Sequence, residues 1–451
     1  MKGCLKAGAA KVDITPAVGM ELCGHFRNDL KSTGVHSSLY AKAVVLSDGD
    51  GEAVLVACDL LGLTSDFVAS ARERISELTG INGVNVMISC THTHSGPGSM
   101  PLRVVGKSDD AYQDQLVKKI AGAVYMASRD MKEAGIGLGI GTEDLAASRR
   151  VKWPDGSIRF EWLSPDIPPE EPVDKELKVL TVKDMERNAV AVAINFACHP
   201  VTMGGKAFNL ISSDFPGVAT GLIEKVKGGK TVAMFLNGAY ADTHPRKDLV
   251  PGYNNRSRVE VDELTMTFGT VLGAAALRIS ETTHIYSDIS VQTRSEIVRV
   301  PLEKPPSEEE LVNAEVPKRE GWWLKPGVDW KEYLLERYRG GKRFETYEDL
   351  EVQVIKIADT FIVGVPGEVF SRIGLEIKKR ACKSGHGKVL VVALANGNPG
   401  YVPAEEDYAV APIGKRGYEL EGSYMLYGRP LVGQGTSTLL IETAVKLIDK
   451  L

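Results

Sequence analysis

The chain has 451 residues, of which 43% are hydrophobic, 25% charged and 7% aromatic, with a formal net charge of -5 at pH 7. This composition is that of an ordinary globular protein and excludes disordered and fibrous chains. Charges of both signs are interspersed without a long basic block, so we expect no nucleic-acid partner.

The cysteine pattern and the N-terminus bear on the compartment. The six cysteines form neither a CxxC pair nor a dense disulfide framework, which is typical of a reducing compartment. The N-terminus lacks a continuous apolar signal region, and no stretch approaches ~20 uninterrupted apolar residues. We therefore expect a cytoplasmic protein without a membrane span.

The first half of the chain alternates between strand-like and helix-like segments. Strands, seen as β-rich runs that end at turn-forming residues, are predicted at 40–49, 51–63, 83–94, 177–184, 189–200 and 231–242. Helices with apolar residues at helical spacing are predicted between them, at 65–80 and 215–229. This alternation predicts a layered α/β fold in which helices cover buried sheets.

The second half repeats this character around one unusual segment. A helix is predicted at 261–282, strand-like segments at 286–302, 350–368 and 388–403, and further helices at 370–385 and 437–451. Residues 303–348 are polar and proline-rich and contain Trp322, Trp323 and Trp330, which suit a lid, an oligomer contact, a substrate wall or buried anchors. We predict one α/β domain over 1–451, of layered α/β/β/α type with mixed sheets flanked by helices, with 303–348 as a polar insertion or lid.

The densest chemical signal is the pair His92 and His94 at the end of a predicted strand. Residues two apart in an extended chain point to the same face, so the two imidazoles project together. Imidazole nitrogen suits zinc, and a catalytic zinc site takes three protein ligands with one position open for water. A pair of hydrogen-bonding histidines in a loop is the alternative.

Three other residues follow predicted strands in the same way. His199 ends an apolar run just before Pro200, where it suits either a metal ligand or a core histidine. Glu368 in a Pro-Gly-Glu turn and Tyr401 after Gly400 place an acid and a phenol in tight turns. An exposed turn carboxylate and a half-buried ring are the alternatives for these two.

Together these motifs resemble the neutral/alkaline non-lysosomal ceramidase family, zinc amidases that cleave the N-acyl bond of ceramide. The shared segments are 13–16, 39–41, 91–98 (THTHSGPG), 196–200, 237–242, 366–368 and 400–402, so the resemblance covers most of the chain. The resemblance is to the family's N-terminal catalytic domain, and we expect this chain to lack the family's C-terminal immunoglobulin-like domain.

The resemblance implies a set of site residues. It places one zinc ion per chain on His92, His199, Glu368 and Tyr401. It places His94 beside the metal-bound water, where it accepts and returns a proton, and Arg149 or its neighbour Arg150 beside the oxyanion. A further family tyrosine corresponds to Tyr418, although the spacing from Asp407 departs from that of the family.

The resemblance implies zinc-dependent hydrolysis of an N-acyl amide by metal-activated water. Two alternatives remain: hydrolysis of a lactone, ester or cyclic carbonyl in a small polar metabolite, and a non-catalytic binding module with a decayed site. A barrel amidohydrolase is disfavoured because several predicted strands precede the histidine pair, and a helical metalloprotease because HExxH is absent. The expected partner is a small molecule with an amide or ester-like carbonyl, and a homo-oligomer is left open.

Overall fold

The computed structural model describes residues 4–27, 29–160, 172–250, 262–313, 324–411 and 415–451. Its largest sheet has eight strands in the order β13-β11-β10-β6-β1-β3-β4-β5. The strands are β1 (Lys6–Asp13), β3 (Tyr40–Ser47), β4 (Glu52–Cys58), β5 (Val86–Cys90), β6 (Lys132–Thr142), β10 (Glu176–Asp184), β11 (Ala189–Phe196) and β13 (Val232–Asn237). Most neighbours are antiparallel, but β4 with β5 and β11 with β13 are parallel, so the sheet is mixed.

A second sheet of four strands has the order β15-β16-β17-β19. It comprises β15 (Val291–Pro301), β16 (Tyr347–Ile357), β17 (Thr360–Gly364) and β19 (Lys388–Val392). Again one pair is parallel, β17 with β19. Short pairs lie outside the two sheets: β2 (Gly34–Val35) with β12 (Leu210–Ile211), β7 (Ala146–Ser148) with β14 (Thr243–Pro245), β8 (Arg150–Lys152) with β9 (Ile158–Phe160), and β18 (Glu368–Val369) with β20 (Tyr401–Val402).

The two sheets pack face to face over an apolar core. Leu46 and Leu55 from the large sheet share a buried cluster with Ile355, Ile362 and Leu390 from the small one. The strand sequences account for this core, because nearly every residue is apolar and can therefore be buried on either face of the sheet. The core therefore joins strands from both ends of the chain.

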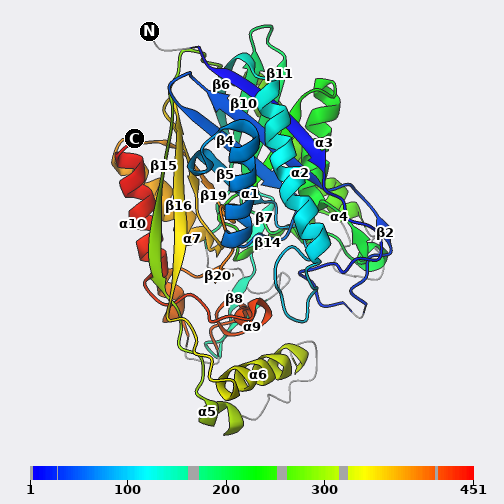
Figure 1. The fold of residues 1–451 in the computed structure, drawn as a ribbon, viewed down its shortest axis with the longest axis vertical. Helices are drawn as coiled ribbons and strands as arrows, with labels where there is room; N and C mark the ends of the chain where they lie inside the picture. Colours follow the sequence, from blue (N-terminus) through cyan, green and yellow to red (C-terminus); the bar gives the residue numbers. More distant parts are fainter. Residues whose placement is uncertain (1–3, 28, 161–171, 251–261, 314–323, 412–414) are drawn as a thin grey trace.

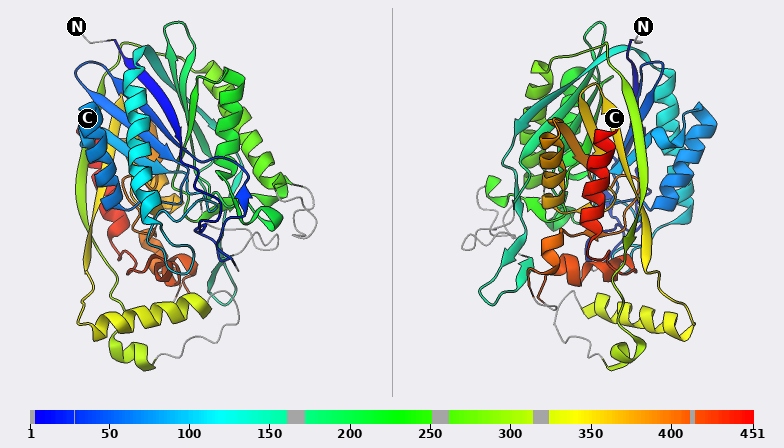
Figure 2. Two further views of the ribbon diagram at one scale, coloured as in Figure 1. Left: turned by 45° about the vertical axis from the view of Figure 1, so that its right-hand side comes forward. Right: turned by 90° about the vertical axis from the view of Figure 1, so that its left-hand side faces the viewer.

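Helices cover both outer faces, as Figures 1 and 2 show. The large sheet is covered by α1 (Ser65–Thr79), α2 (Asp110–Arg129), α3 (Asp214–Lys227) and α4 (Glu263–Thr282), and the small sheet by α7 (Ser371–Lys383) and α10 (Thr436–Asp449). The predicted layered α/β fold with mixed sheets between helices is confirmed. None of the helices in the described segments combines the length and apolar character that crossing a bilayer requires.

Strand β6 shows why one element escaped the sequence analysis. Its sequence, KEAGIGLGIGT, places glycine at every second position, a pattern that disfavours a strand by propensity. In the structure a Cβ on Gly137 would lie 1.9 Å from the carbonyl oxygen of His284, and one on Gly139 would lie 2.3 Å from Ile279 Cγ2. The glycines therefore let the end of α4 and the segment after it lie directly on the strand.

The insertion lies between β15 and β16 and contains two helices, α5 (Glu308–Asn313) and α6 (Leu324–Arg339), which project beyond one end of the two sheets (Figure 1). Trp330 is 4% exposed and packs with Leu311 and Leu334 in a small core of its own. Its ring lies 5.6 Å from that of Tyr424 in α9 (Ser423–Tyr427). Trp330 is thus a buried anchor, whereas Trp322 and Trp323 lie outside the described residues.

Candidate metal centre

The first histidine of the THTH motif is fixed by the loop that follows β5. His92 has a φ of 73°, in the left-handed region that non-glycine residues rarely adopt and that often marks functional sites. Its backbone N–H donates to the carbonyl of Leu60 at 2.9 Å. Its Nδ1 lies 2.6 Å from the carbonyl oxygen of Leu61, which can only accept, so Nδ1 carries the proton. The Nε2 lone pair of His92 is therefore available to a cation.

The other two imidazoles reach the same point from different segments. His94 Nδ1 lies 3.0 Å from the carbonyl oxygen of Gly24, which fixes its tautomer in the same way. His199 follows β11, and its Nδ1 lies 3.4 Å from Nη1 of Arg149, a group that can only donate. His92 and His199 are each 1% exposed, whereas His94 is only partly buried, so solvent reaches this group from the side of His94.

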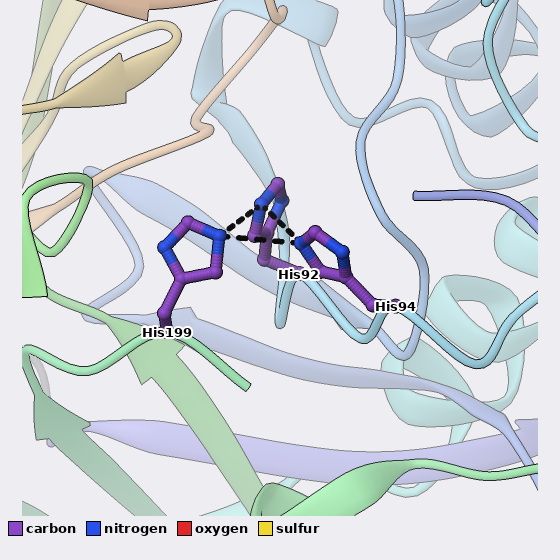
Figure 3. A group of neighbouring side chains, drawn as sticks. All are labelled: His92, His94 and His199. Carbon is purple, nitrogen blue, oxygen red and sulfur yellow. Dashed lines mark hydrogen bonds between the residues drawn. The ribbon is translucent and has the colours of Figure 1, made fainter. Parts of the chain in front are cut away.

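The three Nε2 atoms point toward one another (Figure 3). They are separated by 3.1 Å (His92 and His94), 3.2 Å (His92 and His199) and 3.2 Å (His94 and His199). The pKa of His94 lies well below its usual value because of burial and the neighbouring His25, and that of His199 because of burial and the nearby Arg149. Both imidazoles are thus neutral at pH 7, the state in which imidazole binds a metal.

A carboxylate completes the group from the other sheet. Glu368 lies in β18, just after β17, and is 1% exposed. Its Oε2 lies 3.0 Å from His92 Nε2 and 3.8 Å from His199 Nε2 and accepts no hydrogen bond from the described residues, whereas Oε1 accepts one from the hydroxyl of Tyr427. Burial opposes its ionisation, but the hydrogen bond from the Tyr427 hydroxyl and the charge of the nearby Arg149 favour it, and the pKa of Glu368 lies below its usual value.

These four groups fit a bound divalent cation. The nitrogens of imidazoles bound tetrahedrally to zinc at ~2.0–2.1 Å lie roughly 3.3 Å apart, close to the separations found here. The lone pairs of His92 and His94 face each other, and Glu368 Oε2 meets no donor in the segments that the structure describes. Both contacts are unfavourable unless a cation lies between these groups. Imidazole nitrogen with one carboxylate is also a donor set that zinc accepts.

Beside this group lies a tyrosine held by an arginine. Tyr401 pairs with Glu368 in the register of β20 with β18, so the two lie side by side. Its hydroxyl accepts a hydrogen bond of 2.8 Å from Arg149 Nη2, and its ring lies 5.7 Å from that of Tyr418. The pKa of Tyr401 lies well above its usual value because of burial, although Arg149 opposes this.

A buried ion-pair network holds Arg149 in place. Arg149 Nε donates to Glu419 Oε1 at 2.8 Å, and Arg150 Nη1 donates to Glu419 Oε2 at 2.9 Å. Arg150 also donates to Asp407 at 3.1 Å. Of the two neighbouring arginines, Arg149 is therefore the one that contacts Tyr401 and His199, while Arg150 binds carboxylates behind it.

The structure thus brings all the predicted site residues into one region. His92, His94, His199 and Glu368 converge on one point, with Tyr401, Arg149 and Tyr418 packed beside them. The division of roles, with His94 as a proton carrier and not a ligand, stays a prediction, because its Nε2 lies as close to the other two as they lie to each other.

Two contributors were missed by the sequence analysis. Glu419 directly follows Tyr418, and an acid next to a predicted site tyrosine was a usable signal. Tyr427 lies in α9, 59 residues after the glutamate it contacts, and no motif pointed to it.

Comparisons with known proteins agree on one family. Residues 5–255 match the family model described as neutral/alkaline non-lysosomal ceramidase, N-terminal. Neutral ceramidase B of Dictyostelium discoideum is 28% identical over 242 residues, which is 50% of this chain and 32% of that protein. A neutral ceramidase of Mycobacterium tuberculosis is 23% identical over 496 aligned residues, which is 94% of this chain and 74% of that protein.

A solved structure resembles the whole chain. The crystal structure of neutral ceramidase from Pseudomonas aeruginosa covers 100% of this chain and 75% of its own, with a TM-score of 0.73 and 20% sequence identity. At this identity the likeness establishes the fold. The chain spans about a third of the length of the Dictyostelium relative.

Proposed function

Since the chain belongs to the neutral/alkaline non-lysosomal ceramidase family, we propose that it is a zinc-dependent amidase that hydrolyses an N-acyl bond. The observation that supports this most is the convergence of three imidazole nitrogens with a carboxylate oxygen that accepts no hydrogen bond from the described part of the chain. His92, His199 and Glu368, together with Tyr401, would hold the cation. A zinc ion in such a site supplies Lewis acidity toward a carbonyl and lowers the pKa of water to about 7.

The chain's own groups account for the proton and the developing charge. His94 Nε2 faces the cluster from the partly exposed side, so it takes the proton of the attacking water and delivers it to the leaving nitrogen. The carbon–nitrogen bond breaks, and the products are a carboxylic acid and an amine. Arg149, fixed by Glu419, holds negative charge on the carbonyl oxygen, a contribution of about 3 kcal/mol in comparable sites.

The test combines metal content with amide hydrolysis. Purified wild type is expected to bind about one zinc ion per chain and to release fatty acid from an N-acyl amide, and His92→Ala to lose both. His284→Ala serves as the matched control, because His284 is exposed. Cleavage of esters or lactones without amides would favour the alternative reaction, and wild type that binds no zinc would refute the metal centre.

A second variant separates the roles of the histidines. His94→Ala is expected to retain zinc and to lose a factor of about 10²–10⁴ in turnover, the range for a missing general acid–base group. Loss of zinc from this variant would make His94 a ligand.

We further propose a cytoplasmic location, supported by six free thiols of which four are buried. Fractionation of the source cells, with a periplasmic or secreted marker as control, tests it.

A further inference from the structure

An arginine that has no carboxylate partner among the described residues lies beside the histidine cluster. Arg27 Nε donates to the carbonyl of Phe208 at 2.9 Å, and Nη2 donates to the carbonyl of His94 at 2.8 Å. Within the described residues, Nη1 of Arg27 has no hydrogen-bond partner, and no carboxylate forms an ion pair with Arg27. The guanidinium also lies 4.7 Å from the centre of the Phe208 ring.

Such an arrangement is unfavourable in a protein on its own. Burial lowers the pKa of Arg27 to about 10, with Cys23 opposing, so the guanidinium stays charged at neutral pH. A partly buried charge without an opposite charge costs free energy that an anionic ligand would recover. The two hydrogen bonds to backbone carbonyls fix the orientation of the guanidinium and leave its Nη1 for such a ligand.

A histidine next to it offers a second polar atom. The centre of the His25 ring lies 4.7 Å from that of His94 and 5.0 Å from that of Phe208. Its Nε2 has no hydrogen-bond partner among the described residues. Segment 24–27 therefore presents two unused polar atoms next to the one imidazole of the cluster that solvent reaches.

The same region also has an apolar side. Phe26, Tyr418 and Tyr427 are partly buried and pack on a cluster that contains Leu61 and Met100. Tyr427 and Tyr418 are also neighbours of Glu368 and Tyr401, so this apolar surface borders the candidate metal centre. A molecule bound at His94 thus lies close both to a cation and to aromatic rings.

We propose that the substrate is an N-acyl amino acid, whose carboxylate binds Arg27 and His25 and whose acyl chain lies against Phe26, Tyr418 and Tyr427. This inference rests on the proposed amidase function. In that function His94 delivers a proton to the leaving nitrogen, so the amine half of the substrate lies toward His94. It therefore also lies toward Arg27, which donates a hydrogen bond to the backbone carbonyl of His94. Ceramide carries no charge and would leave the guanidinium without the opposite charge that the described residues do not supply.

The test compares two amides that differ only in charge: N-decanoylglycine and N-decanoylglycinamide. The zinc-loaded full chain is assayed for release of decanoic acid, and wild type is expected to prefer the carboxylate by about 10- to 100-fold in kcat/KM, as hydrogen bonds to charged groups allow. Arg27→Met is expected to keep its zinc and to bring the ratio of the two kcat/KM values to about one. The ratio is the readout, because the loss of the Arg27 hydrogen bond to the carbonyl of His94 lowers both rates together. Arg27→Lys should restore part of the preference.

Lys31→Met, at an exposed position of the same loop, is the matched control and should behave as wild type. Equal rates on the two amides in wild type, or an equal loss on both in a zinc-loaded Arg27→Met protein, would overturn the inference. If neither amide is cleaved, calorimetric binding of the two compounds decides about Arg27, and the hydrolysis of other N-acyl amides decides about the proposed function. A binding preference for decanoylglycine that Arg27→Met abolishes supports the carboxylate site, and equal binding refutes it.

Discussion

The carboxylate of Glu419 is expected to stabilise the fold as well as the site. It is 1% exposed and accepts hydrogen bonds from both Arg149 and Arg150, which are also almost fully buried. Replacing Glu419 by Gln removes a negative charge that both guanidiniums contact, and it leaves the hydrogen bond from Arg150 to the Asp407 carboxylate in place. Breaking a buried ion pair from one side costs about 3–5 kcal/mol, so we expect a loss of that size in the free energy of unfolding.

Urea unfolding followed by tryptophan fluorescence measures this loss. The matched control is Asp349→Asn, because Asp349 forms two comparable hydrogen bonds of 2.8 and 2.9 Å with Arg299 on the surface. There we expect no measurable change, since water solvates both groups in either state. If Glu419→Gln lowered stability no more than the surface variant, the argument that burial makes the difference would be refuted.

Three further variants test other contacts. Tyr427→Phe removes the hydroxyl that hydrogen-bonds Glu368, so zinc affinity from chelator competition should fall by about 10- to 100-fold, and an unchanged affinity would contradict this role. Trp330→Ala should lower the stability of the insertion by about 3–5 kcal/mol, because it removes the largest side chain of its small core. Limited proteolysis should then cut the insertion faster while the two sheets and their helices stay folded. Asp242, bonded by Ser371, has a pKa raised by burial to about 6, so its ionisation destabilises the fold as pH rises from the unfolded value of 3.8 through 6. Asp242→Asn should therefore gain about 2 kcal/mol in the free energy of unfolding relative to wild type between pH 4 and pH 7. If the urea midpoints of the two proteins changed with pH in parallel, this explanation would be wrong.

Most of the fold could be predicted because hydrophobic periodicity is local. The strand predicted at 189–200 is β11 (Ala189–Phe196), and the helix predicted at 65–80 is α1 (Ser65–Thr79). Helix α2 (Asp110–Arg129) was missed although its signal was present: Asp109 precedes it, and the Asp109 side chain accepts from the N–H of Tyr112 at 2.8 Å. Strand β6 was missed for another reason. Its glycines are required by close packing against Ile279 and His284, which lie more than a hundred residues further along the chain.

The site was predictable to the extent that its residues stand in short motifs. The THTH pair, His199 before Pro200 and the Pro-Gly-Glu turn were visible because each follows an apolar run. The contacts that set their roles were not, because they join distant segments. Gly24, which fixes the tautomer of His94, lies 70 residues before it, and Glu419 lies 270 residues after Arg149.

The position of the site follows from how the parallel strand pairs are oriented. The cluster residues follow the carboxyl ends of β5, β11 and β17, each a member of one of the three parallel pairs of the two main sheets. The interlayer core fixes one sheet against the other, so it also fixes His92 and His199, from the large sheet, against Glu368, from the small one. Core residues such as Leu55 and Ile362 therefore control the distance between imidazole and carboxylate without touching either. Because a packed interior transmits small displacements, the geometry of the metal centre depends on the packing between the sheets as well as on its own ligands.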